Sequence, residues 1–286
     1  MANPTQLSSP QVETLSPVES LARLYLGADW KRRILVMLRP YFDCSRSGQG
    51  DGVVVVSGWL SSVDRWLRFE TDWKLTLAKF DVPYFHMREF AHSAGAYSSG
   101  WKGENNKREL FVRALLEIIS DYGLASFSCL VETSVFDKID KEYEVREFFG
   151  NEYALCGRTC VAEVTRWSQA NGYGVPDEFV FEDGDERGRL TWLMEASGYP
   201  APIFKPSRDR ITQVCTVRGQ LPLQAADFAA YELRKSWDDF GDTAEVWRYR
   251  KSFQGIGKAT KGQGYWGQIK PEDLRRVCIE QNVPLR

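Results

Sequence analysis

Hydrophobic positions along this chain follow two periods, and each period predicts one kind of element. Alternating or continuous apolar runs bounded by turn-forming residues predict strands over residues 34–43, 53–59, 125–133, 178–182, 202–205 and 213–217. Apolar residues three and four positions apart predict helices over residues 18–26, 62–79, 104–122, 149–170, 187–196 and 223–237. The glycine-rich stretch 48–52 between the first two strands is typical of a hairpin connection, so we expect those strands to be antiparallel.

The order of these elements favours an α/β fold. Strands come first, and strands alternating with helices come later, which predicts a mixed β-sheet flanked by α-helices rather than a bundle or a sandwich. We expect residues 1–17, rich in Ser, Pro, Thr and Gln, to form a flexible arm, and residues 18–286 to form a single domain. The basic and aromatic stretch from about residue 243 would be an extension of that domain.

The composition is that of a globular protein without membrane segments. With 43% hydrophobic residues among 286, the chain can bury a large core. No stretch approaches ~20 uninterrupted apolar residues, and residues 1–18 lack the charged and apolar regions of a signal peptide. We therefore expect a cytoplasmic protein with no membrane partner, and the pattern leaves its oligomeric state open.

Cysteine, histidine and net charge exclude several kinds of site. The only histidines are His86 and His92, which cannot build a histidine-rich zinc centre. The six cysteines are scattered, and the one close pair, Cys156 and Cys160, has helical spacing in an apolar stretch, which favours core packing over a redox or zinc role. A net charge of −2 does not indicate a general attraction to polyanions.

Several acidic residues stand at the ends of hydrophobic segments, where an ionised carboxylate is unfavourable without a positive partner. Asp43 ends one predicted strand, Glu182 and Asp183 stand at the end of another, and Asp227 lies in an otherwise apolar helical stretch. Glu89 stands near a further strand end and would supply an additional carboxylate. Carboxylates from separate elements are what Mg²⁺ ions roughly 4 Å apart require in a phosphoryl-transfer site, so these residues predict a shared cation.

Each acid also has a simpler interpretation. Asp43 precedes Ser45 and Gly48 and can turn the chain, and Asp183 belongs to an Asp-Gly-Asp turn that can cap the next helix. Glu89 can form a surface ion pair, and Asp227 can be neutralised by a nearby base such as Arg234. The spacing of these acids along the sequence is compatible with a shared cation site and with these simpler roles.

Basic residues cluster between the Glu182 and Asp227 segments. They are Lys205, Arg208, Arg210 and Arg218, and a second basic group over residues 248–261 is mixed with aromatic residues. Such a mixture suits phosphate binding and base stacking, and solvated loop charge is the alternative.

Four local motifs carry a resemblance to a known family. They are Asp43-Cys44-Ser45 followed by Gly48, His86-Met87-Arg88-Glu89-Phe90, Phe181-Glu182-Asp183-Gly184-Asp185, and Leu223-Gln224-Ala225-Ala226-Asp227. Over about residues 34–237 they resemble the successive motifs of an uncharacterised bacterial and phage family, domain of unknown function 3800. The resemblance implies an RNase H-like fold in which Asp43, Glu182 and Asp227 hold the metal of a nuclease-like site. The family's distribution suggests a phage-defence or mobile-element setting.

The chain departs from the family pattern at one chemically important position. The family commonly has Asp-Glu-Ser-Gly, whereas here Cys44 occupies the Glu position and two residues precede Gly48. The loss of a second carboxylate leaves open both the number of metals and catalytic competence.

The sequence therefore predicts a divalent-metal-dependent nuclease acting on DNA or RNA. Asp43, Glu182 and Asp227 would hold Mg²⁺ or Mn²⁺, with Asp183 and Glu89 assisting. Two alternatives stay open, namely an inactive RNase H-like module that binds nucleic acid or regulates, and a hydrolase of a small phosphorylated metabolite.

Overall fold

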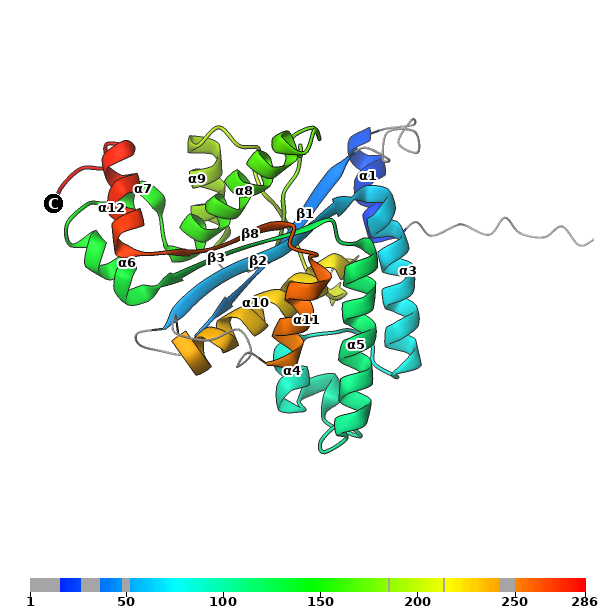
Figure 1. Cartoon of the computed structure of the whole chain (residues 1–286). Helices are drawn as coiled ribbons and strands as arrows, with labels where there is room; N and C mark the ends of the chain where they lie inside the picture. The colour runs from blue at the N-terminus through cyan, green and yellow to red at the C-terminus, as the bar shows by residue number, and fades with distance from the viewer. Residues whose placement is uncertain (1–15, 27–36, 48–51, 185, 213, 242–249) are drawn as a thin grey trace, which may run out of the picture.

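One mixed β-sheet organises the molecule (Figure 1). The computed structural model describes residues 16–26, 37–47, 52–184, 186–212, 214–241 and 250–286. The strand order is β5-β4-β1-β2-β3-β8. These strands are β1 (Leu38–Arg46), β2 (Val53–Ser62), β3 (Ala125–Glu132), β4 (Val180–Glu182), β5 (Ile203–Lys205) and β8 (Gly264–Ile269). Strands β1, β2 and β3 pair antiparallel, whereas β4 and β5 run parallel to β1, and β8 runs parallel to β3.

Helices cover both faces of the sheet, which confirms the α/β class (Figure 1). On one face α10 (Leu221–Phe240) packs directly on β1 and β2. Further out on this side lie α1 (Pro17–Leu26), α3 (Val63–Lys79), α4 (Met87–His92), η2 (Gly95–Tyr97), α5 (Asn105–Tyr122) and α11 (Lys251–Ala259). The other face carries α6 (Thr133–Asp140), α7 (Val145–Phe149), α8 (Glu152–Ala170), α9 (Arg187–Ala196) and α12 (Pro271–Glu280). A separate two-stranded sheet pairs β6 (Arg210–Ile211) with β7 (Thr216–Val217).

Side-chain alternation along the strands divides the core into two main clusters. On β1, Tyr41 belongs to the cluster under α10, and the next residue, Phe42, belongs to the cluster under α8. On β4, Val180 and Phe181 divide in the same way. Because successive strand residues point to opposite faces, the residue after each phenylalanine projects towards α10.

The central strand shows why the sheet is covered on both sides. Every residue of β2 is buried, as the continuous run Val53-Val54-Val55-Val56 predicts for a strand between two helical layers. Its antiparallel pairing with β1 confirms the predicted hairpin.

Two of the predicted boundaries that differ from the structure lie near the site. Strand β1 continues to Arg46, so Asp43 lies inside a strand rather than at its end. The helix expected over 149–170 is broken at Gly150, whose φ of 83° lies in the left-handed region. The chain restarts as α8 with Asn151 as its N-cap, its side chain accepting a hydrogen bond from the Ala154 amide at 2.9 Å.

Only part of the predicted terminal segments lies within the residues that the structure describes. Of the expected arm, residues 1–15 lie outside the described residues, and α1 begins at Pro17. The extension expected from about residue 243 supplies β8, an edge strand of the main sheet, together with α11 and α12. Residues 34–36 and 213 of two predicted strands also lie outside the described residues. Among the helices of the described part, none has the length and apolar character to cross a membrane.

Candidate functional site

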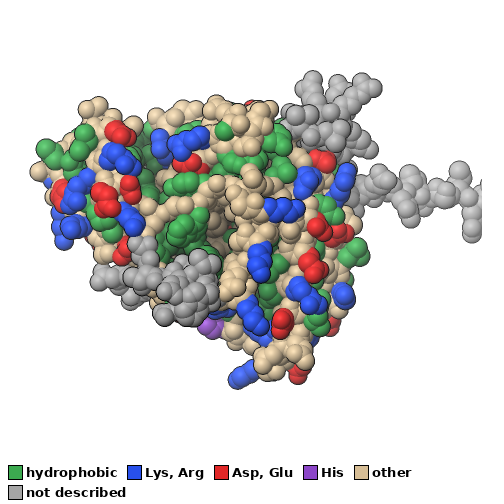
Figure 2. All heavy atoms as spheres, in the orientation of Figure 1, with side chains coloured by type: hydrophobic (Ala, Val, Ile, Leu, Met, Phe, Trp, Pro, Cys, Tyr) green, Lys and Arg blue, Asp and Glu red, His purple; other side chains and the backbone are tan. Residues whose placement is uncertain are grey.

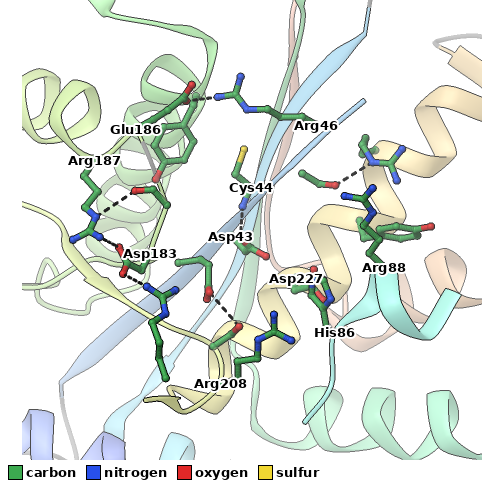
Figure 3. Close-up of a pocket in the computed structure, with 18 of the residues that line it drawn as sticks. Asp43, Cys44, Arg46, His86, Arg88, Asp183, Glu186, Arg187, Arg208 and Asp227 are labelled. Atoms are coloured by element: carbon green, nitrogen blue, oxygen red, sulfur yellow. Dashed lines mark hydrogen bonds and ion pairs between the residues drawn. The ribbon is translucent and has the colours of Figure 1, made fainter. Parts of the chain in front are cut away.

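A cavity of about 1070 Å³ opens beside the carboxyl ends of β1 and β4 (Figure 3). Its walls come from β1, the end of β4 and the turn after it, α4, the loop over residues 207–210, α10, and the first residues of α8 and α9. Asp43, Glu182, Asp183 and Asp227 all line it. The structure therefore brings four of the five predicted acids to one place.

Strand register places the first two acids side by side. Phe42 pairs with Phe181 in the parallel β1–β4 ladder, so the next residues along each strand, Asp43 and Glu182, are neighbours. Both project from the sheet face that α10 covers. Neighbouring parallel strands thus present two carboxylates at the same height.

Helix α10 supplies the third acid. Asp227 stands on the part of α10 that crosses β1 and β2, and its half-buried side chain enters the cavity. Its Oδ2 accepts a hydrogen bond from the backbone N–H of Met87, 2.5 Å away, at the start of α4. Arg234 does not neutralise Asp227, because its guanidinium bonds to Ser45 Oγ at 3.0 Å and pairs with Asp238.

The three carboxylates perturb one another electrostatically. Burial raises the pKa of Asp43 well above its usual range, and repulsion from Asp227 and Glu182 raises it further. Burial raises the pKa of Glu182 to about 7, with the hydrogen bonds from Ser207 opposing and Asp227 adding to the rise. Burial also raises the pKa of Asp227, against the favourable field of His86 and the Met87 amide. A cation bound between the three carboxylates would relieve this mutual repulsion.

The donor set fits a hard divalent cation in chemistry. Within the described residues, no ion pair links Asp43, Glu182 or Asp227 to a lysine or arginine. Glu182 Oε1 accepts a hydrogen bond from the Ser207 hydroxyl at 3.2 Å, while its Oε2 is buried with no hydrogen-bond partner in that part of the chain. Carboxylate oxygens of this kind are the ligands that Mg²⁺ and Mn²⁺ prefer. The side chains as placed do not form a ready-made metal cluster: the described ranges contain no group of three or more His, Cys, Asp or Glu poised to ligate one.

The two assisting acids differ from these three, because arginines neutralise them. Asp183 lies between Arg187 and Arg210, with N–O distances of 2.6 Å and 2.8 Å (Figure 3). The first acid of the Asp-Gly-Asp turn is thus ion-paired rather than free.

Glu89 is neutralised on α4, and it is not among the residues that line the cavity. It accepts hydrogen bonds from Tyr84 at 2.8 Å and Arg208 at 2.9 Å, and its Oε1 lies 3.3 Å from His86 Nδ1. Burial opposes ionisation of Glu89, but these contacts outweigh it and lower the pKa. The structure places Glu89 in the first turn of a helix rather than at a strand end, and its ion pair with Arg208 matches the simpler interpretation.

Two of the four predicted phosphate-binding residues reach the cavity. Arg208 and Arg210 line it, each paired with an acid. Lys205 and Arg218 are not part of its lining, and Arg218 instead pairs with Asp209 at 2.7 Å. Over α3 and α5, Figure 2 shows Lys/Arg and Asp/Glu side chains interspersed, so positive charge on that face forms mixed patches.

The cavity also contains arginines that were not among the predicted phosphate-binding residues. They are Arg46, Arg88, Arg187 and Arg234. Arg46 pairs with Glu186, whereas the exposed Arg88 forms no ion pair with any other described residue. Arg234 follows Asp227 by seven residues, two helical turns, so helical periodicity alone would have placed it on the same face.

Cys44, which stands where the pattern of the resembled family has Glu, lies on β1 and lines the cavity. Burial raises the pKa of its thiol to about 12, so the side chain is a neutral thiol at physiological pH. It does not replace the missing carboxylate.

Comparison with known proteins gives similarities in fold only. No family profile and no curated protein sequence matches this chain, so membership of the family that its motifs resemble is not confirmed. The solved structures it is similar to include ribonuclease HII from Archaeoglobus fulgidus in a complex with PCNA, with 15% identity, a TM-score of 0.34, and 78% of this chain and 87% of that chain covered. Ribonuclease H2 from Pyrococcus horikoshii OT3 has 13% identity and a TM-score of 0.33, covering 78% and 99%. Bst-RNase HIII in complex with Mn²⁺ has 12% identity and a TM-score of 0.36, covering 88% and 71%. Because these TM-scores are below 0.5, the fold class rests on the sheet and helix layers of this chain.

Proposed function

We propose that this protein is a divalent-metal-dependent phosphodiesterase that acts on DNA or RNA. The observation that carries the proposal is the meeting of Asp43, Glu182 and Asp227 in one cavity, without a lysine or arginine ion pair within the described residues. Partly buried carboxylates that repel one another are unfavourable in a purely structural role. They are expected in a site that binds a cation, because the cation offsets the repulsion.

Asp43, Glu182 and Asp227 would hold Mg²⁺ or Mn²⁺. When bound, the cation supplies Lewis-acid activation of water and stabilises charge on phosphate oxygens. The Ser207 hydroxyl and the Met87 amide hold Glu182 and Asp227 in orientation through their hydrogen bonds.

The cavity arginines would bind the phosphodiester. Arg88 is free to take a phosphate oxygen directly. Arg208 and Arg210 would share their guanidinium donors between phosphate and their present partners, Glu89 and Asp183. Arginine suits this task because its planar fork donates two parallel hydrogen bonds.

The test compares Asp227→Asn with Asp239→Asn. Both substitutions remove one negative charge from α10, but Asp239 pairs with Lys235 on the helix surface and does not line the cavity. We expect wild-type protein and Asp239→Asn to bind Mn²⁺ in calorimetry and to cleave single- or double-stranded substrates. Asp227→Asn should reduce both signals to background. Equal cleavage by the three proteins would refute the proposal.

Cys44 favours a second candidate, an inactive module that binds nucleic acid. A neutral thiol replaces a charged ligand there, which weakens a second metal position. Binding of an oligonucleotide without cleavage, in Mg²⁺ and in Mn²⁺, would select the module. Affinity that does not fall with salt would instead indicate a small phosphorylated ligand, because polyanion binding releases counterions.

A further inference from the structure

A single buried amide connects the segments that carry the candidate site. Gln224 lies on α10 one turn before Asp227, and its side chain is almost fully buried, with 1% exposure. Its Oε1 accepts two hydrogen bonds, from Trp73 Nε1 and from the backbone N–H of Phe85, each at 2.9 Å. Its Nε2 donates to the backbone carbonyl of Ser207 at 2.8 Å.

Two of these contacts lead to an acid of the site. Ser207, whose carbonyl Gln224 holds, donates its hydroxyl to Glu182 Oε1 at 3.2 Å. Phe85 lies two residues before Met87, whose amide donates to Asp227 Oδ2 at 2.5 Å. The third contact, with Trp73, fixes the amide itself against α3.

Only an amide side chain satisfies all three partners at this place. It offers an acceptor oxygen with two lone pairs and a separate N–H donor on one short stem. A carboxylate would face the Ser207 carbonyl without a donor, and an apolar side chain would leave two buried N–H groups and a carbonyl unpaired. The spacing of three residues puts Gln224 and Asp227 on neighbouring positions of one helix face. This contact pattern gives a physical reason for the order of Gln224 and Asp227 in the motif over residues 223–227.

We propose that Gln224 is a positioning residue of the metal site, holding the Ser207 loop and the segment over residues 85–87 so that Glu182 and Asp227 face one another. The inference rests on the proposed function. Gln224 itself does not touch the reacting groups. Outer partners that orient ligands typically change metal affinity by about 10–100-fold when they are removed.

The experiment measures Mn²⁺ affinity by calorimetry, and kcat and KM on an oligonucleotide, in Gln224→Met and Ser207→Ala. Gln220→Met is the matched control: Gln220 is a buried glutamine at the start of the same helix, 4% exposed, and among the described residues its side chain accepts one hydrogen bond, from Tyr41 at 3.4 Å. Val164→Ala, in the core on the opposite sheet face, shows what loss of stability alone does to metal affinity.

We expect Gln224→Met and Ser207→Ala to weaken Mn²⁺ binding by about 10–100-fold and to lower kcat more than they change KM. Gln220→Met and Val164→Ala should bind Mn²⁺ like the wild type. If Gln224→Met does not fold, Gln224→Glu decides, because it keeps the length of the side chain and its acceptor oxygens and removes the donor to the Ser207 carbonyl.

Two outcomes overturn the inference and are distinguishable. Wild-type Mn²⁺ affinity in both Gln224→Met and Ser207→Ala, or an equal loss in Val164→Ala, would refute the positioning role while leaving the metal site intact. Failure of wild-type protein to bind Mn²⁺ would refute the proposed function, and this inference with it.

Discussion

Replacing Glu182 by glutamine should stabilise the metal-free protein at alkaline pH. The side chain keeps its shape, and its amide oxygen still accepts the Ser207 hydroxyl that bonds to Oε1 at 3.2 Å. What the substitution removes is a partly buried negative charge next to Asp43 and Asp227. Glu182→Gln therefore tests whether burial, together with repulsion from Asp227, makes the ionised Glu182 carboxylate unfavourable in the folded state.

The magnitude follows from the pKa of Glu182, which burial raises from 4.5 to about 7. At about 1.36 kcal/mol per pH unit, the change corresponds to roughly 3 kcal/mol, which solvent screening of a half-buried group reduces to roughly 1–3 kcal/mol. Between these two pH values the folded protein holds a proton that the unfolded chain has lost, so raising the pH favours unfolding. The free energy of unfolding of the wild type should fall through this window and then level off.

Urea denaturation followed by tryptophan fluorescence measures the effect. At about pH 8.5, Glu182→Gln should be more stable than the wild type by roughly 1–3 kcal/mol, and the difference should vanish as the pH approaches 4.5. Saturating Mn²⁺ should stabilise the wild type by about 2.7 kcal/mol at 100 times its dissociation constant, and the variant by less.

Two results would contradict this reasoning. Stability profiles that run parallel across the pH range would show that the Glu182 carboxyl is not strained in the folded state. Equal stabilisation of both proteins by Mn²⁺ would place metal binding elsewhere.

Two further substitutions test the cavity and the sheet. In fluorescence anisotropy titrations with Ca²⁺, Arg88→Ala should weaken oligonucleotide binding and lower the slope of log affinity against log salt by about 1. The control is Arg113→Ala, which replaces an exposed residue on α5 outside the cavity and should change neither the affinity nor the slope. Equal losses in the two variants would show that Arg88 does not contact a phosphate. Gly58→Ala should destabilise the protein by ~1–3 kcal/mol or more in thermal denaturation, because a Cβ on this β2 residue overlaps the carbonyl oxygen of Tyr41 on β1. An unchanged melting temperature would show that β1 and β2 can move apart there without cost.

Local sequence selected the acidic residues, but it could not separate the ion-paired acids from the others. The apolar stretches around Asp43, Glu182 and Asp227 singled them out because an unpaired charge beside packed side chains is unfavourable wherever the chain folds. The same reasoning added Asp183 and Glu89 as assisting acids. The structure separates the two groups, since arginines pair with Asp183 and Glu89 but not with the other three.

By itself the sequence determined what depends on near neighbours: the helices α3, α5 and α10, the buried strand β2, and the hairpin between β1 and β2. Tertiary structure decided what depends on contacts between distant residues. The β1–β4 register places Asp43 beside Glu182, and β8 pairs with β3 as an edge strand of the sheet. Gln224 forms hydrogen bonds with the backbone of Ser207 and Phe85. Local periodicity carries no information on register between distant strands, or on which arginine meets which acid, because the whole chain selects these contacts as it packs its core.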